Sequence, residues 1–227
     1  MPATTPVYGW PYQSLPDPPD GPNLGEDLGI AIENTVLSLQ SRIQQLEANV
    51  PAIAANLPIQ FRSSQITTGS VPSVLFSDIP TNLRHLRLVY SARGDNASHA
   101  QFLHARINAD AGAQYHYSYI QVNNATVAGA SATGVAQEVV GFSTGSLASA
   151  GQYASGVCDW SGWDSPHANG LGHVFTFQCL GNGIANFFAG AGGGSYSPVG
   201  PYTSITLLPG NGGNIIAGSE FTLYGFI

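Results

Sequence analysis

The chain has 227 residues, of which only 8% are charged, compared with about 25% in an ordinary soluble protein. Its six basic residues are all arginines, no basic run occurs, and the formal net charge is -7. Because binding to phosphate groups needs clustered Lys or Arg, we do not expect a nucleic-acid partner.

Membrane insertion and export are not expected either. No apolar run approaches the roughly 18 residues that span a bilayer. The first residues carry neither the basic start nor the apolar stretch of a secretory signal, so we expect a protein made in a cytosol. In that compartment Cys158 and Cys179 are expected to be buried thiols rather than a metal framework, and a disulfide formed after release is the alternative.

The N-terminal segment, residues 1–22, contains seven of the 15 prolines and the aromatic residues Tyr8, Trp10 and Tyr12. Prolines hold a chain in extended conformations with few backbone donors, and aromatic side chains on such a strand act as anchors. The segment cannot build a core of its own. We therefore predict an extended anchoring arm that lies in a groove on another protein, with a flexible tail as the alternative.

Residues 23–58 are predicted to form a coiled-coil helix. Asn23 is the expected N-cap, with Glu26 at the third helical position. Apolar residues then recur at alternating spacings of four and three, which is the heptad seam of a coiled coil. The seam consists of Ile32, Val36, Leu39, Ile43, Leu46, Val50, Ile53 and Leu57. Pro51 removes a backbone donor, so we expect the helix to end or kink there, after a rod of about 40 Å.

Arg42 and Glu47 bear on the number of associating chains. In this register they occupy g and e positions of successive heptads, which meet across neighbouring chains in a parallel coiled coil. The string "RIQQLE" (42–47) resembles a short trimerisation motif of coiled coils, which implies three parallel strands. The residues at a and d alone would equally suit a dimer. A helix that packs on its own domain is a further alternative, because Ile30 and Leu37 at b positions widen the apolar stripe.

From residue 59 to residue 227, short alternating runs separated by Gly, Asn, Ser and Pro replace the helical pattern. Runs rich in Val, Ile, Tyr, Phe and Thr and bounded by turn residues predict an antiparallel β domain. We therefore predict a mainly β fold, in which a β-sandwich head of jelly-roll type follows the arm and the helix. The clearest strands are 83–93, 114–122, 173–180, 203–209 and 220–227, whereas "GAGGGSYSPVGP" (190–201) is predicted to be a surface loop.

Catalytic and cofactor motifs are weak. The string "GFSTG" (141–145) matches the nucleophile-elbow pattern, but no helix is predicted after it, so a turn is expected. The six histidines lack metal-ligand spacing, and a chain without lysine has no phosphate-binding loop of the P-loop type. We expect no enzyme activity, no metal and no cofactor.

One stretch, "CDWSGWDSPH" (158–167), places acidic side chains beside aromatic faces that could hold a sugar. Trp160, Trp163 and Asp164 are therefore hypothetical glycan contacts. A capped turn against the core of the head is the alternative for the same residues.

The two ends of the chain carry a resemblance. The leader "TPVYGWPYQSLPDPPDGPNLGEDLGIAIE" and the ending "TSITLLPGNGGNIIAGSEFTLYGFI" are similar to the N-terminal stretch and the C-terminal hairpin of a family of phage proteins. These are the minor tail or capsid decoration proteins of tailed bacteriophages that infect actinobacteria. The resemblance covers about a quarter of the chain. It implies a non-enzymatic virion surface protein, made in the host cytoplasm, whose arm grips a capsid or tail protein.

These features together predict a homotrimeric spike whose head faces outward, either toward a host surface glycan or as inert cover of the particle. A soluble carbohydrate-binding module is the alternative function, and it would work without the arm. A glycan hydrolase is a third hypothesis, but no pair of acidic residues has a context that fixes the spacing a glycosidase requires.

Overall fold

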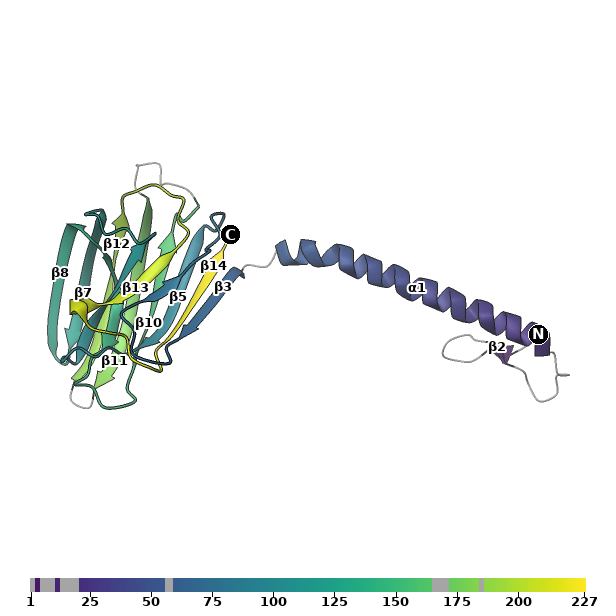
Figure 1. Ribbon diagram of the computed structural model, residues 1–227, viewed down its shortest axis with the longest axis horizontal. Helices are drawn as coiled ribbons and strands as arrows, with labels where there is room; N and C mark the ends of the chain where they lie inside the picture. Colours follow the sequence, from purple (N-terminus) through teal and green to yellow (C-terminus); the bar gives the residue numbers. More distant parts are fainter. Residues whose placement is uncertain (1–2, 5–10, 13–20, 56–58, 165–171, 184–185) are drawn as a thin grey trace. The chain divides into compact units, whose positions relative to one another are not determined.

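The computed structural model describes residues 3–4, 11–12, 21–55, 59–164, 172–183 and 186–227 (Figure 1). Its internal contacts divide the chain into two compact units, residues 1–57 and 58–227. Within the described ranges, no helix combines the length and the apolar character that a membrane crossing requires.

The N-terminal unit consists of a long helix, α1 (Gly21–Ala55), and two short strands, β1 (Ala3–Thr4) and β2 (Pro11–Tyr12). The strands pair antiparallel, with Ala3 opposite Tyr12, so the arm doubles back on itself rather than running straight. β2 also contacts α1. Of the predicted anchors, Tyr12 lies in β2, whereas Tyr8 and Trp10 fall outside the described residues.

The bounds of α1 differ from the prediction. The helix begins at Gly21, two residues before the expected cap Asn23, and it runs through Pro51 to Ala55, so it does not end at Pro51. A proline inside a helix costs about 3 kcal/mol, because one hydrogen bond is lost and the ring crowds the preceding turn. The residues after Pro51 include three alanines, the strongest helix former, which favour continuation. At about 1.5 Å per residue the 35 residues form a rod about 52 Å long.

The C-terminal unit is built from two antiparallel sheets, which confirms the mainly β prediction (Figure 1). The larger sheet has eight strands in the order β3-β14-β5-β10-β11-β12-β7-β8. Their bounds are β3 (Ile59–Ile66), β5 (His85–Ala92), β7 (Tyr115–Asn123), β8 (Thr126–Val135), β10 (Ala154–Ser161), β11 (His173–Gly183), β12 (Asn186–Tyr196) and β14 (Glu220–Phe226).

The smaller sheet has four strands in the order β4-β13-β6-β9. Their bounds are β4 (Val74–Phe76), β6 (Ala100–Ile107), β9 (Glu138–Thr144) and β13 (Ile205–Pro209), and a short 3-10 helix, η1 (Gly210–Gly212), follows β13. At η1 the glycine-rich stretch "PGNGGN" (209–214) turns the chain, and Gly212 has a φ of 73°, a conformation that glycine adopts without strain.

Residues from both sheets form one hydrophobic core. On β5 the alternation that predicted a strand matches the burial, since Leu86, Leu88 and Tyr90 are buried whereas Arg87 and Val89 are exposed. Fully burying a side chain of this size stabilises a fold by about 1.5–3 kcal/mol. The inward faces of the strands therefore supply the main stabilisation of the head.

β12 is a strand that the sequence did not predict, because its glycine-rich run was expected to be a loop. It pairs with β11 on one side and β7 on the other. A Cβ atom on Gly192 or Gly194 would collide with carbonyl oxygens of β7, those of Ser118 and His116. Glycine at these positions therefore permits close approach of neighbouring backbones.

The "GFSTG" motif is also strand rather than the predicted turn. Its first four residues lie in β9, and Ser143 is 3% exposed. A buried strand serine is not presented to a substrate, so the motif is not a nucleophile elbow.

Cys158 and Cys179 are buried and free, as the sequence predicted. They lie on the paired strands β10 and β11, where Gly156 is opposite Cys179. Burial raises the pKa of the Cys179 thiol to about 11 and raises that of Cys158 well above its usual range. Both thiols therefore stay protonated and react slowly at neutral pH.

Candidate functional site

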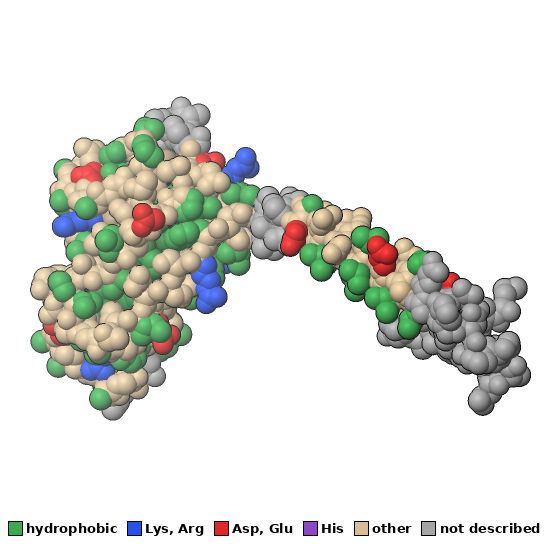
Figure 2. All heavy atoms as spheres, turned by 45° about the vertical axis from the view of Figure 1, so that its right-hand side comes forward, with side chains coloured by type: hydrophobic (Ala, Val, Ile, Leu, Met, Phe, Trp, Pro, Cys, Tyr) green, Lys and Arg blue, Asp and Glu red, His purple; other side chains and the backbone are tan. Residues whose placement is uncertain are grey.

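The helix α1 carries a continuous set of exposed apolar side chains. Eight Leu, Ile and Val side chains between residues 28 and 46 are 37% to 66% exposed. The five that belong to the predicted seam are Ile32 at 45%, Val36 at 46%, Leu39 at 52%, Ile43 at 54% and Leu46 at 66%. Their spacing places them on one side of the helix, along which Figure 2 shows apolar side chains.

An exposed apolar seam of this length calls for a partner surface. Removing apolar surface from water is worth about 25 cal/mol per Å², so covering five such side chains is strongly favourable. Most helices in proteins owe their stability to the packing of an apolar face rather than to intrinsic propensity. Among the described residues, the seam is therefore a surface well suited to association.

The flank of the seam is open as well. Ile30 and Leu37, at the b positions, are 51% and 55% exposed. Among the described side chains of α1, both the five seam residues and these two flanking residues are exposed.

Arg42 and Glu47 are exposed side chains beside the seam. Throughout the described ranges, neither takes part in an ion pair. They are five residues apart, and residues at that separation do not face each other on one helix. Both charges are therefore free to pair with another chain. The side chains of Val50, Ile53 and Leu57, the rest of the predicted seam, lie outside the described residues.

Burial removes Trp160 and Trp163 as glycan contacts. Trp160 is fully buried, and its indole Nε1 donates a hydrogen bond of 2.6 Å to Glu138 Oε1. Trp163 is 2% exposed, and its ring centroid lies 5.1 Å from that of Tyr202. Asp164 remains near the surface, with its Oδ2 3.7 Å from Arg84 Nε. Both tryptophans are core residues: the alternation of β10 directs Trp160 inward, and Trp163, just after β10, packs against Tyr202.

Glu138 is the centre of a buried polar cluster that the sequence did not reveal. Its Oε1 accepts the hydrogen bond from Trp160 of β10, and its Oε2 lies 3.3 Å from Nε2 of His173 on β11. The side chains of Glu138 and His173 are 0% exposed. Since Glu138 belongs to the smaller sheet and its two partners to the larger one, the cluster ties the sheets together across the core.

The chemistry of this cluster is structural. Carboxylate and imidazole groups can transfer protons, but a catalytic pair must come within hydrogen-bond reach of a substrate. Complete burial of both groups excludes that. His104, whose Nδ1 lies 3.3 Å from the Glu138 carbonyl oxygen, is also buried, and this burial lowers its pKa to about 4. His104 is therefore neutral at physiological pH.

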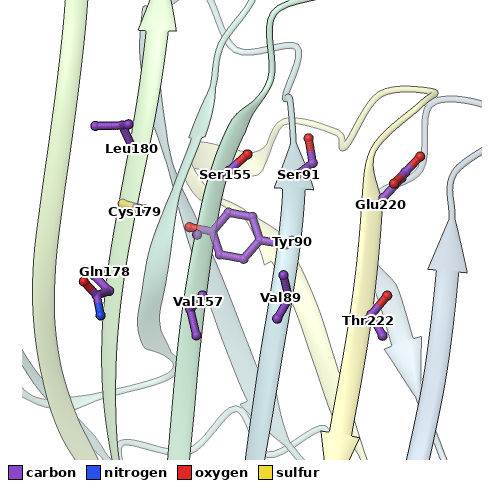
Figure 3. A pocket seen from close by; sticks show the side chains of 11 residues that line it. Val89, Tyr90, Ser91, Ser155, Val157, Gln178, Cys179, Leu180, Glu220 and Thr222 are labelled. Carbon is purple, nitrogen blue, oxygen red and sulfur yellow. The ribbon is translucent and has the colours of Figure 1, made fainter.

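A shallow hollow of about 650 Å³ lies on the outer face of the larger sheet, over β14, β5, β10 and β11 (Figure 3). The short side chains of Ser91 and Ser155 line it, together with Val89, Val157 and Leu180. Small-molecule sites are usually concave, with a few polar groups that converge on one point. This hollow is wide and open and lacks such convergence, so it is better suited to a macromolecular surface.

A second hollow, of about 360 Å³, lies where the start of β6 and β12 meets the end of β7. It combines aromatic rings with amide and hydroxyl groups and has no formally charged side chain in its lining. The lining residues are Ser98, His99, Ala100, Gln101, Phe102, Gln121, Asn123, Phe142, Leu147, Phe188 and Asn211. His99 Nδ1 and Gln101 Oε1 are buried and have no hydrogen-bond partner within the described part of the chain.

Metal binding finds no support in the residues that the structure describes, because they contain no group of three or more His, Cys, Asp or Glu side chains that could hold an ion.

Comparisons with known proteins do not indicate a function for this chain. No family model matches the chain, and no curated protein matches it. Among solved structures, a fructofuranosidase from Schwanniomyces occidentalis in complex with fructosylnystose is similar over 74% of this chain and 33% of its own length. The sequence identity is 5% and the TM-score is 0.21, values at which a likeness carries no argument.

Proposed function

We propose that three copies of this chain associate through α1 into a parallel coiled coil, and that the trimer is a non-enzymatic surface component of a tailed-phage virion. The N-terminal arm attaches the trimer to a capsid or tail protein. The head faces outward as a capsid decoration or as part of a tail tip that contacts the host.

The observation that carries this proposal is the seam of exposed apolar side chains on α1. Ile32, Leu39 and Leu46 at d positions alternate with Val36 and Ile43 at a positions, and all five are at least 45% exposed. A partner with the same seam would cover them by knobs-into-holes packing. Copies of the same chain supply such a partner without any other protein.

The number three is supported by the charged residues of the seam. Arg42 at g and Glu47 at e belong to the "RIQQLE" string that resembles a trimerisation motif. In parallel strands a g position meets the e position of the neighbouring chain. The exposure of both side chains leaves them available for that contact.

We further propose that the head is a jelly roll with two inserted hairpins. Leaving out β7-β8 and β11-β12, the sheet orders reduce to β3-β14-β5-β10 and β4-β13-β6-β9. Strands β3 to β6 then alternate between the sheets, and β13 and β14 return beside the first two strands. This connectivity supports a jelly roll, and the inserted hairpins account for the eight-stranded width of the larger sheet.

The virion location rests on the resemblance of the leader and the ending to phage surface proteins, and on the composition of the arm. A segment rich in proline with three aromatic residues cannot form a core and is suited to lie against another protein. Its short hairpin, β1 with β2, gives it two strands of backbone to present.

Deletion of residues 1–20, which leaves α1 intact, tests the location. In an infected host that expresses the tagged chain, the full-length protein is expected to co-purify with phage particles on a density gradient. The deleted form is expected to be absent from particles, because it lacks the attachment segment, while light scattering still gives three copies in solution. Incorporation of the deleted form at the full-length level would contradict the role of the arm.

Glycan binding is a second candidate function, and the hollow near His99 favours it. Phe102 offers an aromatic ring, Gln121 and Asn123 offer amide groups, and the lining has no formal charge. Neutral sugars are typically held by this combination of an apolar ring face and neutral hydrogen-bonding groups.

Saturation-transfer NMR with a panel of neutral monosaccharides tests this second function. At least one sugar is expected to bind with a dissociation constant, obtained by titrating the signal, that rises about tenfold on replacing both Gln121 and Asn123 by alanine, which corresponds to about 1.4 kcal/mol of lost contacts. Replacing Trp163 by phenylalanine serves as a control, because that buried ring lines no part of this hollow. Equal dissociation constants for the double variant and the parent would refute sugar binding at this hollow.

A further inference from the structure

The outer face of the eight-stranded sheet is a continuous surface whose composition is known from the strand register. Side chains at paired positions of an antiparallel sheet point to the same side. One row across the sheet joins Ile66, Glu220, Ser91, Ser155 and Leu180, and it continues through Ala189, Val122 and Val127. The next row contains Ser64, Thr222, Val89, Val157, Gln178, Ala191, Ile120 and Gly129.

These rows are more apolar than an ordinary protein surface. Ile66, Leu180 and Val127 are 63%, 52% and 61% exposed, and Val89 and Ile120 are 41% and 54% exposed. A sheet face that remains in water normally alternates with polar side chains directed outward. In this sheet, by contrast, six of the eight strands direct at least one exposed or half-buried Val, Ile or Leu side chain outward.

Charge is nearly absent from the same face. Along the described residues of the eight strands, four side chains are charged, and all four point outward. Arg87 and Asp159 pair with each other through two hydrogen bonds of 2.7 and 3.0 Å. Arg62 lies over the ring of Tyr224, 5.9 Å from its centroid. The fourth, Glu220, is an exposed carboxylate that lines the hollow and has no ion pair among the described residues. One unpaired carboxylate and one arginine over a ring leave this face with little free charge, and low charge is a mark of protein–protein interfaces.

We infer that this face packs against the heads of neighbouring copies of the same chain. The inference rests on the proposed self-association through α1 and adds to it a second contact surface. Only three residues, 56–58, separate Ala55 of α1 from Ile59 of β3. A path of four Cα–Cα steps spans at most about 15 Å. Association of the helices therefore confines the heads to a small volume, at an effective concentration in the millimolar range.

The larger sheet offers more contact area than the smaller one, which favours its outer face as the contact surface. Eight strands spaced by about 4.8 Å, with rows about 6.8 Å apart, give a surface about 34 Å wide and 20 Å high, or about 700 Å². In a ring of three copies each head turns about half of this face, about 350 Å², toward each neighbour, which is less than the roughly 800 Å² that each partner buries in a standard interface and suits a contact between heads already tethered by their helices. The smaller sheet has only four strands and offers less than half of the area of the larger one.

The hollow in Figure 3 lies within this face, so the face is concave there rather than flat. Ser91 and Ser155 leave a depression beside the larger side chains of Val157 and Leu180. Interfaces derive much of their affinity from side chains that enter such depressions at their centre. In a ring of three copies the contacts are heterologous, so the β3 side of one head meets the β11 side of the next.

Cysteine labelling of the full chain tests the inference. Ser155→Cys places a thiol in the hollow, and Ser77→Cys places one at an exposed position just after β4, outside the face. The native thiols are buried and give a low background with a maleimide reagent. In the trimer, Ser155→Cys is expected to react at least tenfold more slowly than Ser77→Cys. Adding Leu39→Ser and Ile43→Ser, which disrupt the seam, is expected to make the two rates equal.

Light scattering on the same samples distinguishes the helix trimer from the contact between heads. A mass of three copies with equal labelling rates would overturn the head contact and leave the helix trimer standing. A mass of one copy for the chain with an intact seam would overturn the proposed self-association and this inference with it. Slow labelling in both seam-intact and seam-disrupted chains would show that the hollow is covered within one chain, which also overturns the inference.

Discussion

Replacing Leu39 and Ile43 by serine is expected to change the purified chain from three copies to one at micromolar concentration. These residues occupy successive d and a positions and are 52% and 54% exposed in the single chain. Burial of a Leu or Ile side chain is worth about 1.5–3 kcal/mol, and the double replacement removes six of them from a trimer. Because only about half of each side chain is exposed in the single chain, the loss is about 5–9 kcal/mol per trimer, which is a large share of the free energy that holds a short coiled coil together.

The matched control is the pair Ile30→Ser and Leu37→Ser. These positions carry the same two residue types at nearly the same exposure, 51% and 55%, but lie at b, outside the seam. A coiled coil packs its a and d positions, so this variant is expected to keep a mass of three copies. Multi-angle light scattering after size exclusion measures both. If the b variant dissociated and the seam variant did not, α1 would pack through its flank, and the coiled coil would be refuted.

The head and the helix differ in how far a single chain buries their apolar side chains. The head has a core formed from both sheets and is complete as a single copy, whereas the seam of α1 has apolar side chains without cover. An arrangement of this kind lets each head fold on its own, and it makes the helix the first element through which the proposed association would form. The low charge of the chain also favours close packing of copies, because few like charges repel one another.

The sequence predicted the elements whose pattern is local. The alternation of Leu86, Leu88 and Tyr90 with polar and exposed residues identified β5, and the ending of the chain identified β14. Spacings of four and three identified α1 and its seam. These signals depend only on which residues follow each other, so they can be read without knowing the fold.

The misses involve residues whose role depends on distant neighbours. The glycines of β12 form a strand because β7 lies close beside it, and no neighbour in sequence indicates that. Trp160 was a hypothetical glycan contact, with a place against the core as the alternative, and the sequence could not decide between them because its partner Glu138 lies on a strand of the opposite sheet. Pro51 lies inside α1 although proline usually ends a helix. In each case the local conformational preference was outweighed by contacts or neighbours that cannot be identified from the sequence alone.

Replacing Glu138 by alanine is expected to lower the free energy of unfolding of the head by about 3–5 kcal/mol. The carboxylate accepts the Trp160 indole hydrogen bond and lies 3.3 Å from His173 Nε2, with both Glu138 and His173 fully buried. Removing one member of a buried polar cluster leaves its partners without hydrogen bonds and away from water, and this penalty falls on two groups at once. Urea unfolding followed by tryptophan fluorescence measures the change, since Trp160 itself reports on the site.

Two further variants separate the cluster from a general effect of losing a carboxylate. Glu138→Gln keeps the shape and an acceptor oxygen for Trp160, so it is expected to lose clearly less than the alanine variant. Glu220→Ala removes an exposed glutamate from the larger sheet and is expected to change stability by less than about 0.5 kcal/mol. Because the cluster joins β9 of one sheet to β10 and β11 of the other, its loss also loosens the packing between sheets. A Glu138→Ala head as stable as the Glu220→Ala head would mean that apolar packing alone holds the two sheets together.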